Sequence, residues 1–286
     1  MKYIVSFVLS LLICFLSLVL ILASVLSVNI FSKNTYSEIV NRFDISQKVY
    51  SEIENVFLDQ SGGSNIPPEV YEDIITLEDV ERIFPDVVDS VMSYAFGETD
   101  EIKPIEIDFT ALEKSLTDYF VNYAKEHNIA MDDAFDNQLK LTIKNAKESV
   151  TSSIDLAVLK KGADLIRPRI KTIKTAVGIS LGVVAAAFVL LSLLLILTAK
   201  KHGVFWILSS VLSSSAISLA GVSLLRIFGI FDGFILKNEV LHTFITGFLK
   251  VLSDSIIITS AVILTFSILG MVYFVFKIKR ERCLQE

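Results

Sequence analysis

Four long stretches without Asp, Glu, Lys, Arg or His divide this chain of 286 residues. They cover residues 3–32, 175–199, 203–225 and 255–276, with lengths of 30, 25, 23 and 22 residues. Each exceeds the roughly 20 residues with which a helix crosses the hydrocarbon core of a bilayer. A helix also satisfies its own backbone hydrogen bonds, as a spanning segment must. The pattern therefore predicts an all-α integral membrane protein with four transmembrane helices, the first of them at 1–30.

The first stretch begins after Lys2, close to the start of the sequence. A cleaved signal peptide is one interpretation, because Val25-Leu26-Ser27 loosely resembles a cleavage site. The apolar run is much longer than the roughly 7 to 15 residues of a signal peptide's hydrophobic region. We therefore expect residues 1–30 to remain as an uncleaved signal anchor.

Residues 31–172, between the first two spans, show apolar positions at helical spacing and predict a helical domain. Thr76 with Asp79 and Thr110 with Glu113 have the spacing of capping boxes, each followed by an apolar stripe. In a capping box the two side chains satisfy backbone donors at the helix start. Helices are therefore expected to begin at both places.

Three features predict breaks within this domain. A helix is expected at 34–60 with an interruption near Asp44, and Pro85 predicts a kink or two short helices because proline removes a backbone donor. Residues 105–109 alternate apolar and acidic side chains, the period of a strand. No second strand candidate is near, so we expect an extended linker packed on helices.

The last helix of the domain is expected to open near Asp132 and to run to about Ala163, before the chain passes Pro168 into the second span. Its apolar residues keep one continuous face. A long helix of this kind either completes the helical bundle or makes a rigid connection to the membrane.

Composition and charge narrow the classes of partner. The chain is 52% hydrophobic and 20% charged, but residues 51–136 hold 22 acidic side chains against 4 basic ones, a net charge of −18 from 4 − 22. Such a field repels nucleic acid and anionic lipid. The acidic clusters lack the ordered ligand spacing of a calcium-binding loop, so a solvated acidic surface is the simpler interpretation. We expect neither a metal nor a cofactor.

Basic residues in the short segments predict the orientation. Lys2, the pair Lys200 and Lys201 and the basic tail at 277–286 supply seven, whereas the opposite loop at 226–254 supplies three. Basic residues concentrate in cytoplasmic segments. Both termini are therefore expected in the cytoplasm, with residues 31–172 outside a membrane that we expect to be a bacterial plasma membrane.

Small residues in the second and third spans mark expected packing faces, because small side chains let helix backbones approach closely. We predict that the two spans pack against each other through these faces, with dimerisation through the two glycines of the second span as the alternative. The helix-packing candidates are Gly178, Gly182, Ser209, Ser213, Ser214, Ser218 and Gly221.

The loop at 226–254 contains apolar and polar residues at helical spacing. This pattern is typical of an amphipathic helix. We expect that helix to lie on the outer leaflet or under the large domain.

Catalytic motifs are absent from the sequence. The four apolar stretches also contain no Asp, Glu, Lys, Arg or His, one of which ion-coupled transporters usually carry there. We therefore expect a non-enzymatic membrane protein whose helical domain outside the cytoplasm binds or senses a protein partner, or a second copy of the chain. The alternatives are a permease subunit or passive channel formed by an oligomer, and a membrane enzyme with an unfamiliar site near Asp132 and Asp133.

Overall fold

The structure of the chain is a computed structural model. It describes residues 2–64, 66–71, 75–104, 107–154, 157–236 and 238–283. The first two residues of the predicted linker at 105–109 and the last three residues of the predicted tail lie outside the described residues. All regular secondary structure in the described part is helical, as expected. The residues fall into two compact units.

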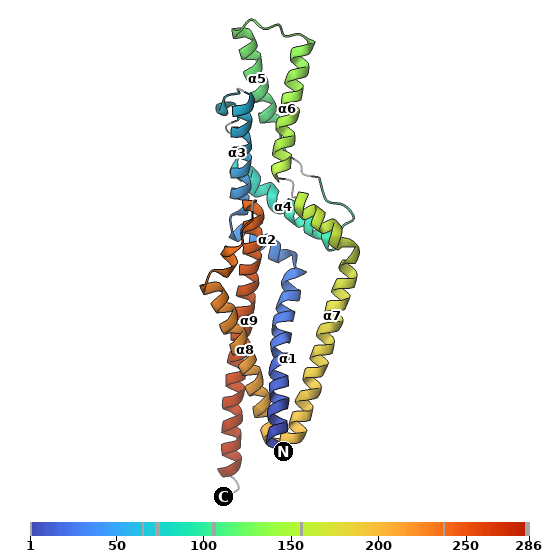
Figure 1. The fold of residues 1–286 in the computed structure, drawn as a ribbon, viewed down its shortest axis with the longest axis vertical. Coiled ribbons are helices and arrows are strands. Elements are labelled where there is room, and N and C mark those ends of the chain that lie inside the picture. Colours follow the sequence, from blue (N-terminus) through green and yellow to red (C-terminus); the bar gives the residue numbers. More distant parts are fainter. Residues whose placement is uncertain are drawn as a thin grey trace. The chain divides into compact units, whose positions relative to one another are not determined.

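The first unit comprises residues 1–35, 172–235 and 245–286. It contains helix α1 (Lys2–Ile30), helix α8 (Gly203–Ile227), and most of α7 (Ala157–Ala199) and α9 (Glu239–Cys283). These four helices are long and apolar enough to cross a membrane, which confirms that part of the prediction. Figure 1 shows them as extended rods.

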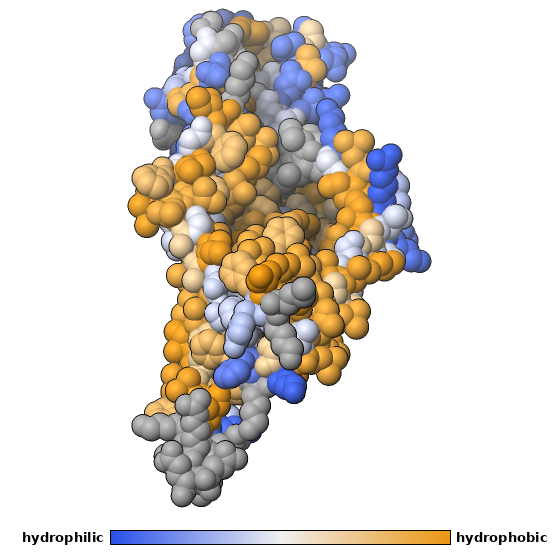
Figure 2. All heavy atoms as spheres, turned by 60° about the horizontal axis from the view of Figure 1, so that its bottom comes forward, coloured by the Kyte–Doolittle hydropathy of each residue, from blue (hydrophilic) through white to orange (hydrophobic). Residues whose placement is uncertain are grey.

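Large apolar side chains of this unit are widely exposed, and Figure 2 shows apolar residues covering much of the surface in view. Leu197 on α7 is 77% exposed and Phe266 on α9 is 69% exposed. Water would make this surface costly, because apolar area removed from water contributes about 25 cal/mol per Å². Lipid carries no such cost, so the surface fits a membrane protein.

The helices of the first unit share two small apolar clusters. Leu9 and Ile13 of α1 pack with Leu195 of α7, and Val25 of α1 packs with Leu252 and Ile256 of α9. Residues of α8 pack against both clusters. α7 is the least buried of the four helices.

A tight turn joins α7 to α8 through the three-residue 3₁₀ helix η2 (Lys200–His202). Lys200 has a φ of 50°, in the left-handed region. The backbone then passes so close to α7 that a Cβ on Gly203 would lie 2.6 Å from the Cα of Ile196. Glycine is required here because no other residue fits this approach.

The segment at 226–254 differs in extent from the predicted amphipathic helix. After α8 and the short helix η3 (Ile230–Gly233), helix α9 begins at Glu239 and continues without a break to Cys283. The Asn238 side chain accepts a 2.7 Å hydrogen bond from the backbone N–H of Leu241 and so caps its start. The amphipathic segment and the fourth span are therefore one helix.

The second unit comprises residues 36–171 and 236–244. Its helices are α2 (Lys33–Arg42), α3 (Ile45–Ser64), the short η1 (Pro68–Val70), α4 (Leu77–Ala95), α5 (Thr110–Glu126) and α6 (Asp133–Ile154). The break expected near Asp44 is confirmed: α2 and α3 meet there, and Asp44 has a φ of 48°. In Figure 1, α5 and α6 lie side by side as a hairpin.

The core of the second unit lies along α3 and α4. Its apolar side chains recur at helical spacing, which explains why these segments form helices that pack on one another. The most deeply buried are Ile39, Val40, Ile45, Val49, Ile53, Val80, Phe84, Val88, Leu112, Leu116, Ala124, Ala146 and Val150.

Helix starts in this unit match the sequence in one case and differ in another. Thr76 and Asp79 form the predicted capping box at α4, and hydrogen bonds from Thr76 hold the pKa of Asp79 below its usual value. Thr110 and Glu113 do not form one. The Asp108 carboxylate instead accepts hydrogen bonds from the N–H and hydroxyl of Thr110, and Glu113 pairs with Lys147 of α6.

Neither proline interrupts its helix. Pro85 lies inside the single helix α4, so the expectation of two short helices is wrong, and Pro168 lies inside α7. The packing of a buried apolar face on both sides of Pro85, at Phe84 and Val88, outweighs the one backbone hydrogen bond that proline removes.

The first part of α7 is fastened to the end of α4 within this unit. The Arg167 guanidinium lies 4.2 Å from the centre of the Tyr94 ring and donates hydrogen bonds to the carbonyls of Thr99 and Asp100 and to the Asp100 carboxylate. The Tyr94 hydroxyl donates a 2.8 Å hydrogen bond to Asp164. Through these contacts, Arg167 and the first part of α7 pack within the second unit.

Candidate functional site

Serine hydroxyls connect the helices of the first unit. Ser10 of α1 and Ser210 of α8 share a hydrogen bond of 2.6 Å, and Ser214 of α8 donates to Ser17 of α1 over 2.9 Å. On the same helix, Ser218 accepts a 3.0 Å hydrogen bond from Ser260 of α9.

These serines are small enough for the backbones to come close, and α1 and α8 make the most extensive contact between helices in the described part. Ser214 and Ser260 have no exposed surface. In lipid a serine hydroxyl can donate to a carbonyl of its own helix, as Ser210 does to Trp206, and a second serine across the contact adds a partner on the neighbouring helix. The serines therefore determine which faces of α1, α8 and α9 meet.

The predicted packing residues divide into two groups. Ser214 and Ser218 lie in helix contacts, but with α1 and α9 rather than with α7. Ser213 is exposed and Ser209 is half-buried. A Cβ on any of the glycines Gly178, Gly182 and Gly221 would meet nothing within 4 Å.

The predicted pairing of α7 with α8 through these faces is therefore not what the structure has. The physical reason is that a shift of one residue turns a helix position by about 100°. The buried serines of α8 are Ser210, Ser214, Ser215 and Ser218. Three of them, Ser210, Ser214 and Ser218, lie at intervals of four and contact other helices, while Ser209 and Ser213 occupy a neighbouring face. Sequence reasoning also missed Ser10, Ser17 and Ser260, although the four-residue spacing on α8 was a usable signal.

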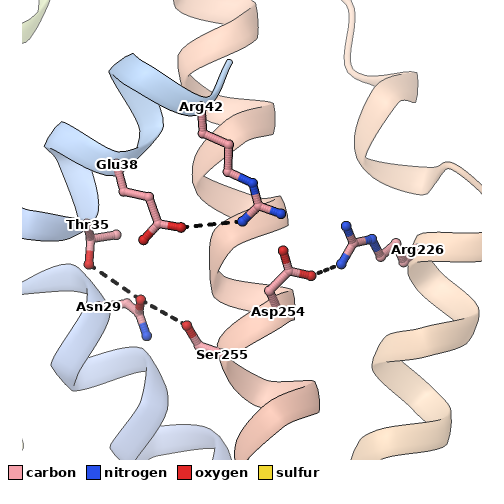
Figure 3. Close-up of polar contacts among 7 residues, drawn as sticks. All are labelled: Asn29, Thr35, Glu38, Arg42, Arg226, Asp254 and Ser255. Carbon is pink, nitrogen blue, oxygen red and sulfur yellow. Dashed lines mark hydrogen bonds and ion pairs between the residues drawn. The ribbon is translucent and has the colours of Figure 1, made fainter. Parts of the chain in front are cut away.

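A second polar contact centres on the side chain of Asn29 at the end of α1 (Figure 3). Its amide nitrogen donates to the carbonyl of Val25 over 2.9 Å. Its amide oxygen accepts hydrogen bonds from Ser255 of α9 at 3.3 Å and from Thr35 at 3.4 Å. Asn29 is 8% exposed, so these partners satisfy a buried polar group.

Two ion pairs connect α9 to the end of α8 and to η3. Asp254 pairs with Arg226, the contact drawn in Figure 3, and Lys250 pairs with Asp232 at 2.7 Å. Lys250 and Asp254 lie one helical turn apart on α9, so they face the same side. Asp232 and Asp254 are thus both held by a cation within the first unit.

In the second unit, a groove of about 710 Å³ runs beside α3, and we call it the acidic groove. Three carboxylates and one lysine line it together with amide and hydroxyl side chains. Lys48 pairs with Glu239, which connects α3 to the start of α9 within this unit. The lining residues are Phe43, Asp44, Gln47, Lys48, Ser51, Glu52, Asn55, Asn238, Glu239 and Val240.

Two carboxylates of the acidic groove, Asp44 and Glu52, have no matching cation among the described residues, and Glu52 also lies near Glu239. The pKa of Glu52 is raised, first because burial disfavours the charged form and then because Glu239 is negative. Lys48 is already paired with Glu239. The groove therefore holds more negative charge than its own cation balances.

A second groove, of about 540 Å³, adjoins the first, and we call it the aromatic groove. Ser51 and Asn55 line both grooves. Phe57 and Tyr71 stack in its wall with ring centres 4.8 Å apart, and Leu58 at its edge is 55% exposed. The lining residues are Tyr50, Ser51, Ile53, Glu54, Asn55, Phe57, Leu58, Pro68, Tyr71 and Ile75.

Residues that sequence reasoning considered for metal or acid–base chemistry have structural contacts. Asp132 accepts hydrogen bonds from the backbone N–H groups of Ala134 and Phe135 and so caps α6. The His127 ring stacks on Tyr123, with ring centres 4.1 Å apart. Within the described ranges, no group of three or more His, Cys, Asp or Glu side chains is placed to hold a metal ion.

Comparisons of the chain with protein-family models, with curated proteins and with solved structures find no match. The fold itself defines the class: a helical membrane protein with four helices suited to span a bilayer.

Replacing Ser214 with Leu is expected to destabilise the protein by about 1 to 3 kcal/mol, because the larger side chain must displace α1. Ser213→Leu is the matched control, one position earlier and exposed. Thermal unfolding in detergent measures the difference. Equal melting temperatures for the two variants would show that α1 does not pack on this face of α8.

Removing either member of the pair Arg226 and Asp254 is expected to cost about 1 to 2 kcal/mol, because the remaining charge loses its partner. The exchanged pair, Arg226→Asp with Asp254→Arg, should recover part of that loss. The unchanged protein, the two single variants and the exchanged variant are compared by thermal unfolding in the same detergent. An exchanged protein less stable than both single variants would contradict a direct pairing.

Proposed function

We propose that this protein is a non-enzymatic integral membrane protein whose second unit lies outside the cytoplasm and binds a protein partner. The observation that carries the proposal is the pair of adjoining grooves along α3. Grooves of several hundred Å³ are typical of binding sites. Here the aromatic groove supplies apolar walls, and the acidic groove supplies polar and charged groups. Elsewhere in this unit, packed apolar side chains fill the core.

The polar contacts of the first unit support an anchoring role for its helices. The hydroxyls of Ser210, Ser214 and Ser218 and the amide of Asn29 are used in contacts between helices. Groups used in this way stabilise the arrangement of the helices. Partner binding is therefore assigned to the second unit and membrane attachment to the first.

For the location, we propose a bacterial plasma membrane with both chain ends in the cytoplasm. The support is the excess of basic residues before the first apolar stretch, between the second and the third, and after the fourth. The acidic charge of the second unit is compatible with the outer side. Acidic residues contribute little to orientation, and long domains cross the membrane largely regardless of their charge.

The orientation predicts which single cysteines an impermeant maleimide reaches in intact cells. In a chain with Cys14 and Cys283 replaced, Glu126→Cys on α5 should be labelled, and His202→Cys should react only after the cells are permeabilised. Both positions are exposed. The reverse pattern would place the second unit in the cytoplasm.

Partner binding predicts a covalent product when a photo-crosslinking amino acid replaces exposed residues of the second unit in living cells. Leu58 on α3, Ile129 in the α5–α6 turn and Leu141 on α6 are suitable positions, with exposures of 55%, 46% and 49%. A product of defined mass that contains a second protein is expected from at least one position. Absence of any product from all three would refute the proposed function.

A further inference from the structure

We propose that the acidic and aromatic grooves form one docking surface for a segment of the partner protein that carries a lysine or arginine next to an aliphatic or aromatic side chain. The inference rests on the proposed function and names the chemistry of the partner. Both grooves belong to the second unit, and Ser51 and Asn55 of α3 line both of them.

The acidic groove takes the cationic side chain. Asp44, Glu52 and Glu239 face the single cation Lys48 in its lining, which leaves an excess of two negative charges. Glu52 and Asp44 are on the α2–α3 side, and Glu239 is at the start of α9. A guanidinium or ammonium group between them would relieve the repulsion between Glu52 and Glu239 that their proximity causes.

The aromatic groove takes the apolar side chain. Its apolar wall includes Ile53, Phe57, Tyr71 and Ile75, which are all buried, so this wall is already ordered by packing. Leu58 stands at the edge with more than half of its surface exposed. An apolar anchor that enters a preformed pocket contributes most of the binding free energy in typical interfaces.

Charge over the wider region favours the same partner. Residues 51–136 carry a net charge of −18, from 4 basic and 22 acidic side chains. A field of this size speeds the approach of a cationic protein and repels an acidic one. It also disfavours anionic lipid as the occupant of this surface.

The probe is a library of random peptides displayed on phage and selected on the full chain in lipid nanodiscs, with empty nanodiscs as the background. Enriched peptides should contain a lysine or arginine close to an aliphatic or aromatic residue. Soluble versions of these peptides are then measured by fluorescence anisotropy.

Two substitutions in the grooves have matched controls elsewhere on the second unit. Leu58→Asp on α3 is compared with Leu141→Asp on α6, since the two leucines are 55% and 49% exposed. Glu52→Lys on α3 is compared with Glu126→Lys at the end of α5. Each groove variant should weaken peptide binding at least about tenfold, while each control should stay within about twofold.

The salt dependence of peptide binding separates the contribution of charge from that of the apolar contact. The loss caused by Glu52→Lys should shrink as the salt concentration rises, because screening weakens the charge contact. The loss caused by Leu58→Asp should remain. Circular dichroism and gel filtration of all four variants check that each one folds.

Several outcomes would overturn the docking surface. These are enrichment of acidic peptides, no enrichment over empty nanodiscs, equal losses in groove and control variants, or crosslinking of Leu58 to a second copy of this chain. If the crosslinks described above still join Ile129 or Leu141 to another protein, the proposed function stands without this surface. If crosslinks fail at every position, the function itself is refuted.

Discussion

Hydrogen bonding in a solvent without water is the constraint on which the first unit depends. Lipid offers no partner to a backbone N–H or carbonyl, so each apolar segment must be a helix. The same shortage applies to side chains. The hydroxyls of Ser210, Ser214 and Ser218 have partners on neighbouring helices, and Ser210 and Ser214 also donate to carbonyls of their own helix. Apolar contacts alone discriminate little between helix faces in lipid, because lipid tails are equally apolar.

The second unit has the opposite arrangement of apolar and polar side chains. Its apolar side chains are gathered along α3 and α4, and its charges remain at the surface in contact with water. Local polar contacts fix the ends of its helices, as Thr76 with Asp79 and Asp132 with the start of α6 show. Polar contacts between helices also occur in this unit, as between Tyr94 and Asp164 and between Glu113 and Lys147.

Features that depend on neighbouring residues could be predicted from the sequence, whereas features that depend on distant residues could not. The four apolar helices, the break at Asp44 and the capping box at Thr76 follow from local composition and spacing. At Thr110, by contrast, Glu113 has a stronger partner in Lys147, which lies 34 residues further along the chain. No local pattern reveals such competition.

The candidate site shows the same division. Aromatic and acidic residues near α3 were visible in the sequence, but the contribution of Glu239 to the acidic groove depends on a segment almost 200 residues away. Likewise, small residues on α7 and α8 were correctly noted, yet the partner of Ser214 is on α1. Helix pairing depends on rotation about each axis, which spacing within one helix leaves undetermined.

The tight turn at Gly203 also constrains how the chain is made. Three residues reach at most about 10 Å, far less than the roughly 30 Å of a bilayer's hydrocarbon core. The end of α7 and the beginning of α8 must therefore emerge on one face of the membrane. The two helices therefore cross the bilayer in opposite directions, and no segment longer than the three residues of the turn has to be translocated between them while the chain is made.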